Sequence, residues 1–144
     1  MNKKRWILIT LVLVILTIFL YLIFQNDIKV PQVVEKPDLI RVTSLKSGDI
    51  IKNPFRITGE ARGYWYFEAS FPVLLYDSDG RNIPLNPPYI TAVSNWMTED
   101  FVPFDVMLEF MPPATATGTL VLQKDNPSGL PENDDSLAIP VRFR

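Results

Sequence analysis

The sequence contains no cysteine and no histidine among its 144 residues. Without cysteine, the chain forms no disulfide bond, offers no thiol nucleophile and carries no lipid-modified cysteine at its N-terminus. Without histidine as well, the usual serine and cysteine catalytic triads and the common zinc sites are excluded. We therefore expect a protein that is not an enzyme and that holds no metal and no cofactor.

Charge is missing from residues 6–24, where 15 of the 19 residues are Leu, Ile, Val or Phe. A helix of that length is roughly 28 Å long, close to the thickness of the hydrocarbon core of a bilayer. The pattern predicts one transmembrane helix at residues 6–24. The basic residues at positions 3–5 predict that residues 1–5 form a cytoplasmic tip.

A cleaved signal peptide is the competing interpretation of this N-terminus. Its cleavage site would need small residues, and the stretch Leu20 to Val30 contains no Ala, Gly or Ser. We therefore predict an uncleaved signal anchor. The protein is then a single-pass protein of the cytoplasmic membrane, with an extracytoplasmic C-terminal domain.

Residues 25–37 contain two prolines, Pro31 and Pro37, which disfavour a helix. We interpret them as an extended tether, with a first edge strand through Ile28 to Val34 as the alternative. Beyond the cytoplasmic tip the chain has 11 Lys and Arg against 16 Asp and Glu. A net charge of about −5 argues against nucleic acid or an anionic lipid surface as partner.

Residues 38–144 alternate short apolar segments with turn residues, and no helical period is sustained. The central segment runs from Thr58 to Asp77. From Trp65 its alternate side chains are apolar, which predicts a strand with one buried face and with Tyr66 on the other face. The other strands are predicted at residues 39–43, 55–60, 89–96, 101–110, 118–124 and 137–143.

Seven or eight such strands with turns between them indicate an all-β, antiparallel β-sandwich. Its core would be filled by the aromatic residues Trp65, Phe67, Phe71, Trp96, Phe101, Phe104, Phe110 and Phe143.

Several sequence blocks between Ile40 and Phe143 resemble the immunoglobulin-like domain associated with bacterial spore germination proteins (Gmad type). The resemblance implies an immunoglobulin-like sandwich, an extracytoplasmic accessory role in bacteria and no assigned enzymatic activity. The blocks that carry it are Gly59–Gly63, Trp65–Val73, Trp96–Thr98, Phe101–Phe104, Lys124–Gly129 and Ile139–Val141.

Four tyrosines are the candidate ligand-binding residues, because outward aromatic rings can hold a sugar or a protein partner. They are Tyr64, Tyr66, Tyr76 and Tyr89. Cross-strand pairing that merely stabilises the sheet is the alternative interpretation.

Two acidic features of the sequence are candidates for further sites. Glu68, Asp105 and Glu109 lie on predicted outer faces, and no pattern gathers them in a cleft. The loop at residues 124–136 is rich in Asp, Asn and Glu, which suits either calcium or an ordinary set of turns. Its spacing does not match an EF-hand.

The sequence therefore predicts a non-enzymatic binding or scaffolding module of the bacterial cell envelope, whose partner is an envelope protein or a wall polymer. A carbohydrate-binding module with an aromatic platform is the first alternative, and an envelope hydrolase that uses carboxylates is the second.

Overall fold

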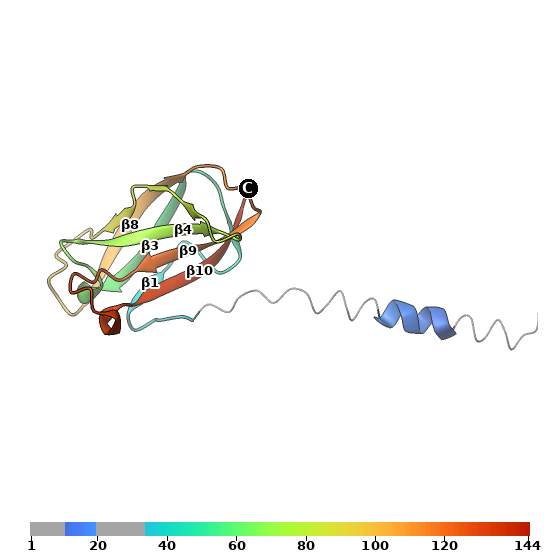
Figure 1. The fold of residues 1–144 in the computed structure, drawn as a ribbon. Helices are drawn as coiled ribbons and strands as arrows, with labels where there is room; N and C mark the ends of the chain where they lie inside the picture. Colours follow the sequence, from blue (N-terminus) through green and yellow to red (C-terminus); the bar gives the residue numbers. More distant parts are fainter. Residues whose placement is uncertain (1–10, 20–33) are drawn as a thin grey trace, which may run out of the picture. The chain divides into compact units, whose positions relative to one another are not determined.

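The computed structural model describes residues 11–19 and 34–144 (Figure 1). The chain divides into two compact units, Met1–Val30 and Pro31–Arg144. In the first unit, residues 11–19 form a helix whose side chains are all exposed. Among the described residues, no helix reaches the length and apolar character that crossing a bilayer requires. The predicted span of residues 6–24 extends beyond the described residues at both ends, and the predicted strand through Ile28 to Val34 lies almost wholly outside them.

The second unit is a β-sandwich with ten strands in two sheets within residues 34–144. The first sheet has the strand order β1 (Ile40–Val42), β3 (Phe55–Arg62), β8 (Phe101–Phe110) and β6 (Leu85–Asn86). The second sheet has the order β2 (Asp49–Ile51), β10 (Ser136–Phe143), β9 (Thr117–Gln123), β4 (Ser70–Asp77) and β5 (Asn82–Ile83), and β7 (Tyr89–Thr91) also pairs with β4.

All strand pairs are antiparallel except β10 with β2, which is parallel. Figure 1 shows β4, β9 and β10 side by side, with the C-terminus at the end of β10. The order matches an immunoglobulin sandwich, in which strands A, B, E and D form one sheet and G, F and C the other. The all-β, immunoglobulin-like prediction is confirmed. The structure has more strands than the predicted seven or eight because it includes strands of only two or three residues, such as β2 and β5.

Strand β8 spans the residues predicted for it. Val102, Phe104, Leu108 and Phe110 are buried, while the alternating Asp105 and Met107 point to solvent. Between the sheets, the rings of Phe71 and Phe104 meet edge to face with centroids 5.6 Å apart. The fully buried Trp65 and Phe71 confirm that the central aromatic residues fill the core.

The predicted continuous strand from Thr58 to Asp77 is wrong. Strand β3 ends at Arg62, a 3-10 turn covers Gly63–Trp65, and β4 begins only at Ser70. Gly63 explains the break, because its N–H group donates a hydrogen bond to the carbonyl of Asp100, in the loop before β8. A Cβ atom at position 63 would overlap the carbonyl oxygen atoms of the same loop, so glycine lets the two segments approach.

Two aromatic residues that were predicted in the core lie at the surface. Phe67 is exposed because the chain turns sharply after Tyr66. Phe101 pairs with Arg62 on the outer face of the first sheet, where the guanidinium groups of Arg41 and Arg62 lie 3.9 and 4.0 Å from its ring centroid. Trp96 and Phe143 are partly buried and pack against the core.

Candidate functional site

Three loops meet at the end of the sandwich opposite the C-terminus (Figure 1). The β3–β4 loop is held to the β7–β8 loop by two main-chain hydrogen bonds: from Gly63 to the carbonyl of Asp100 (3.0 Å) and from Ala92 to the carbonyl of Ala69 (2.8 Å). The N–H group of Asp125 in the β9–β10 loop donates to the carbonyl of Trp65 (3.0 Å). We call this surface the loop tip; it comprises residues 63–69, 92–100 and 124–135.

A two-residue turn presents the aromatic side chains of the loop tip. Phe67 and Ser70 exchange two main-chain hydrogen bonds, of 2.9 and 3.0 Å, and the residues between them are Glu68 (φ 48°) and Ala69 (φ 65°). Such turns normally use Asn-Gly or Gly-Gly, because a side chain at positive φ costs roughly 1–2 kcal/mol. Strain of this kind in a non-glycine turn is typical of ligand clamps and switch regions.

Beneath the turn, Trp65 is completely buried, and its indole N–H group has no hydrogen-bond acceptor among the described residues. Above it, Tyr64 is 50% exposed and Phe67 40% exposed. A buried unpaired donor and a strained turn both cost stability. The β3–β4 loop therefore combines two unfavourable local features with two exposed aromatic rings.

Beside these rings lies an open hollow of about 320 Å³, between the β3–β4 and β9–β10 loops. Its polar side is held in place by the loop itself. The side-chain Nδ2 of Asn126 donates to the carbonyl of Leu130 (2.9 Å) and to Asp134 Oδ1 (2.7 Å). The side-chain Nδ2 of Asn133 donates to Ser128 Oγ (3.0 Å). The hollow is lined by Tyr64, Tyr66, Phe67, Lys124, Asp125, Asn126, Pro127, Ser128 and Asn133.

The carboxylate of Asp125 is half-buried and makes no hydrogen bond or ion pair within the described part of the chain. Lys124, which also lines the hollow, donates from Nζ to the carbonyl of Asn133 (3.0 Å). The hollow thus offers aromatic faces together with a charged acceptor and a charged donor. This set suits a polar ligand that has apolar ring faces.

The four predicted tyrosines do not form one site. Tyr64 lies on the loop tip, but the outward position predicted for Tyr66 is wrong, because its ring is only 3% exposed. Its hydroxyl group donates a hydrogen bond to the carbonyl of Val102 (2.9 Å), and burial raises the pKa of the phenol. Tyr76 lies half-buried on the outer face of the second sheet, and Tyr89 lies near its edge, 50% exposed.

The carboxylates considered for catalysis lie apart. Glu68 is on the loop tip, whereas Asp105 and Glu109 lie on the outer face of the first sheet. Arg56 binds Asp105 through both carboxylate oxygen atoms, and these hydrogen bonds lower the pKa of Asp105. Asp105 is therefore a partner in a surface ion pair.

The acidic loop at residues 124–136 is ordered by side-chain contacts. Asp134 accepts from the amide of Asn126, and Asp135 forms an ion pair with Lys36. Among the described residues, no group of three or more acidic side chains is placed to hold a metal ion.

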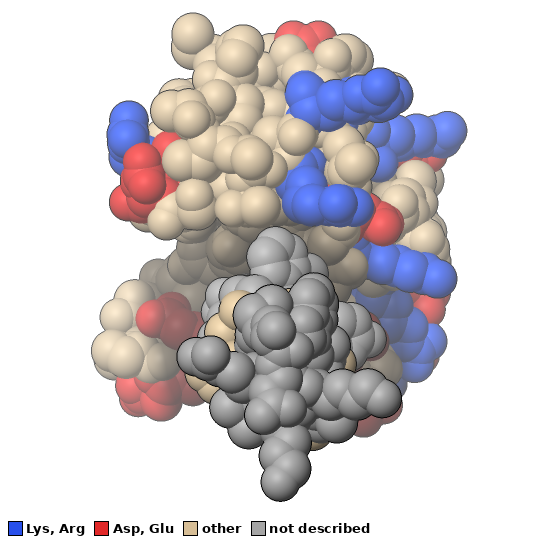
Figure 2. All heavy atoms as spheres, turned by 90° about the vertical axis from the view of Figure 1, so that its right-hand side faces the viewer, with Lys and Arg blue, Asp and Glu red and all other residues tan. Residues whose placement is uncertain are grey.

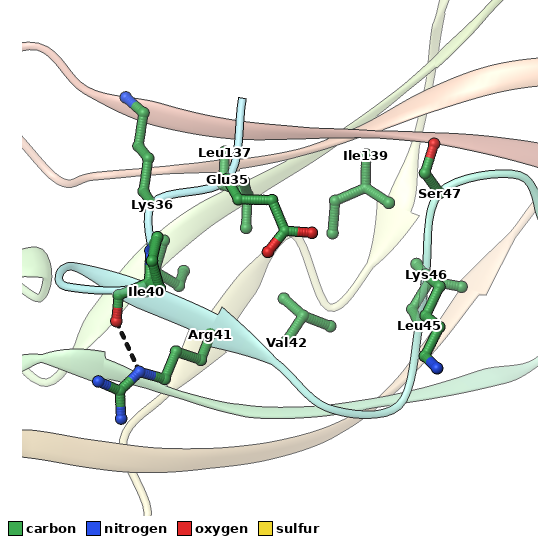
Figure 3. A pocket seen from close by; sticks show the side chains of 11 residues that line it. Glu35, Lys36, Ile40, Arg41, Val42, Leu45, Lys46, Ser47, Leu137 and Ile139 are labelled. Carbon is green, nitrogen blue, oxygen red and sulfur yellow. Dashed lines mark hydrogen bonds between the residues drawn. The ribbon is translucent and has the colours of Figure 1, made fainter. Parts of the chain in front are cut away.

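A second hollow, of about 460 Å³, lies between β1 and the first half of β10 (Figure 3). It opens because β2 pairs only with Val141–Phe143, so that within residues 34–144 no strand pairs with the start of β10 on that edge. Figure 3 shows Val42 of β1 facing Ile139 of β10, with the Glu35 carboxylate over the gap. The lining combines apolar side chains, among them Ile40, Leu137 and Ile139, with charged ones. The charged residues are Glu35, Lys36, Arg41 and Lys46.

The strand order and the two-sheet arrangement define an immunoglobulin-like domain. The comparisons agree with this class. The family model described as the immunoglobulin-like domain of bacterial spore germination (Gmad2) matches residues 39–130, and the chain belongs to that family. No curated protein and no solved structure matched the chain.

Proposed function

We propose that this chain is a non-enzymatic binding module of the bacterial cell envelope that binds a wall polymer through its loop tip. The observation that carries the proposal is the pair of exposed rings, Tyr64 and Phe67, beside the hydrogen-bonding groups of Asp125 and Lys124. The C–H faces of a sugar ring pack on aromatic faces, while its hydroxyl groups require donors and acceptors. The loop tip supplies both.

Anchoring in the cytoplasmic membrane by residues 6–24, with the domain outside, is part of this proposal. The large apolar side chains of the helix at residues 11–19 are all more than half exposed, for example Leu11 at 58% and Phe19 at 59%. Transfer of such side chains from water to lipid is favourable by roughly 1.5–3 kcal/mol each. The basic residues at positions 3–5 favour a cytoplasmic N-terminus.

An envelope protein is the other partner that the sequence leaves open, and the chemistry of the loop tip favours the polymer. The hollow is small and open, and a lysine and a carboxylate lie beside two rings. A protein–protein interface of ordinary strength instead needs a larger, continuous apolar centre.

The test is co-sedimentation of the detergent-solubilised full-length protein with purified peptidoglycan sacculi. We expect Tyr64→Ala and Phe67→Ala each to weaken binding by about tenfold or more, as loss of a central aromatic contact does. Tyr89→Ala is the matched control, because Tyr89 is as exposed as Tyr64 but lies on β7. Unchanged binding by correctly folded tip variants, or no sedimentation of the unmodified protein, would overturn the proposal.

A further inference from the structure

The free edge of β10 directs main-chain hydrogen-bonding groups into the groove between β1 and β10. At the end of β10, the N–H group of Phe143 donates to the carbonyl of Ala116, just before β9 (2.9 Å). Main-chain groups alternate in direction along a strand, so the odd-numbered residues of β10 bond to β9 and the even-numbered ones face the other edge. The carbonyl of Pro140 agrees with this, because it accepts a hydrogen bond from Gly48, in the turn before β2 (2.8 Å).

Ala138 is the even-numbered residue at which this edge is open. Strand β2 pairs only with Val141–Phe143, and within residues 34–144 neither the N–H group nor the carbonyl of Ala138 has a main-chain partner on that side. The carbonyl of Ser136 faces the same edge, whereas Pro140 has no N–H group to offer. An open strand edge of this kind is a template for pairing with another chain.

The groove beside this edge suits the side chains of an added strand. Leu137 and Ile139, on either side of Ala138, are buried and line the groove, and Val42 of β1 faces Ile139 (Figure 3). Directly opposed residues of two paired strands point to the same face of the sheet. An added residue opposite the exposed Ala138 would therefore point to solvent, and its two neighbours would point into the groove.

We propose that this groove docks an extended segment of a partner protein, which adds a strand to the free edge of β10 in line with β2. Its main chain exchanges hydrogen bonds with Ala138, and its apolar side chains at the two flanking positions lie beside Leu137 and Ile139. In strand addition, the main-chain hydrogen bonds supply affinity and the pockets for alternate side chains supply specificity. The site is separate from the loop tip and does not depend on binding of a wall polymer.

The charges around the groove specify the ends of the docked segment. Two of the four charged side chains are already paired, Lys36 with Asp135 and Arg41 with Glu60. The exposed Glu35 and Lys46 have no ion pair among the described residues. Figure 3 shows Glu35 near Leu137 and Lys46 at the other end of the groove. Charge complementarity therefore favours a segment with a basic residue at the Glu35 end and an acidic residue at the Lys46 end.

A lipid acyl chain is the other occupant that an apolar lining would accept. An acyl chain has no hydrogen-bonding groups along its length. It would cover the main-chain groups of Ser136 and Ala138 and leave them without partners, which costs stability. The hydrogen-bonding groups at the edge therefore favour a polypeptide.

The test is an NMR titration of isotope-labelled full-length protein in detergent micelles. The probes are two end-capped peptides, Lys-Val-Thr-Val-Glu and Glu-Val-Thr-Val-Lys, which cover the two directions of an added strand. We expect one of them to bind saturably and to change the amide signals of residues 136–139 and 40–42. The same peptide with all its amides N-methylated, and a peptide with the pattern inverted to Thr-Val-Thr, should each bind at least about tenfold more weakly.

Substitutions in the protein then test the edge itself. Ala138→Pro removes the free N–H group and should leave the pairing with β9 intact, as Pro140 does in the same strand. We expect about tenfold weaker binding, the effect of one lost hydrogen bond, while Ala138→Ser keeps the group and is the matched control. Lys46→Glu should also weaken binding, and replacement of the acidic residue of the peptide by lysine should restore it.

Melting curves verify that each variant is folded. Failure of both peptides to bind, signal changes away from the groove, or full affinity in folded Ala138→Pro would overturn the proposal. Equal binding of the N-methylated peptide would assign the groove to apolar ligands such as acyl chains and would overturn it as well. The peptide controls decide the question even where Ala138→Pro does not fold.

Discussion

The hydroxyl group of Tyr66 donates a hydrogen bond to the main-chain carbonyl of Val102, 2.9 Å away, and so ties the β3–β4 loop to strand β8. The same ring packs edge to face on Phe71, with centroids 5.0 Å apart. One side chain thus connects the loop tip to both sheets of the sandwich. Several measurable properties follow from this position.

Removal of the hydroxyl group should destabilise the domain. Tyr66→Phe leaves the carbonyl of Val102 without its donor, and we expect the free energy of unfolding to fall by about 1–2 kcal/mol in a urea titration. Tyr64→Phe is the control, because Tyr64 is exposed and its loss of a hydroxyl group should change little. Equal effects of the two substitutions would contradict the assignment of Tyr66 to the core.

The free energy of unfolding should depend on pH through the phenol group of Tyr66. Burial raises the pKa of Tyr66 above its ordinary value of 10.0. The folded state therefore keeps this proton when the unfolded state has lost it, so the contribution is fully present below pH 10 and is lost as the pH rises further. We expect Tyr66→Phe to flatten the decline in stability above pH 10 by up to ~1.4 kcal/mol per pH unit. The same decline in both proteins would argue against a buried phenol.

Substitutions in the turn at Glu68 and Ala69 should increase the stability of the domain. Replacing these two residues with Asn and Gly supplies the sequence that a turn with two positive φ angles favours. We expect the double variant to be more stable by about 1–2 kcal/mol in thermal melts, because the side-chain clash at positive φ is relieved. Ala61→Gly, in the buried part of β3, should instead destabilise the domain. A double variant less stable than the unmodified protein would show that the turn is not strained.

The acidic β9–β10 loop should be indifferent to calcium. The carboxylates of Asp134 and Asp135 already interact with Asn126 and Lys36. These two residues therefore do not form a pair of free carboxylates that a bound cation would stabilise. Millimolar calcium added to EDTA-treated protein should shift the melting temperature by less than about a degree. A bound ion at a hundred times its dissociation constant would add ~2.7 kcal/mol, a rise of several degrees. Such a rise, abolished by Asp134→Ala with Asp135→Ala, would establish a calcium site.

The sequence predicts the long strands better than the segments between them. Strand β8 is recognisable because buried and exposed side chains alternate without a break from Phe101 to Phe110. The turn after Tyr66 is not recognisable in the same way. Neither Glu68 nor Ala69 is a usual turn residue at positive φ, and the alternation of side chains in the sequence continues across both positions. The positions of Tyr66 and Phe67 were therefore predicted the wrong way round.

The short strands were missed for a different reason, and so were the contacts of Lys36. Strand β2 has only three residues and forms because it pairs in parallel with β10, about 90 residues further along the chain. Lys36 was assigned to the tether, yet its main-chain carbonyl accepts hydrogen bonds from Leu39 and Ile40 and its side chain pairs with Asp135. Contacts between distant segments decide both features, and a local pattern does not contain them.

The proposed function requires a domain that lies outside the membrane and binds a wall polymer with its loop tip. Its most direct measurement is labelling of single-cysteine variants of the full-length protein with a membrane-impermeant maleimide, in intact cells stripped of their wall. Met97→Cys lies on the loop tip, and Met111→Cys, at a position of similar exposure (69% against 74% for Met97), follows β8 at the other end of the sandwich. We predict that both react without permeabilisation, and that added wall fragments slow the reaction of Met97→Cys alone. Labelling only after permeabilisation, or equal rates with and without wall fragments at both positions, would contradict the claim.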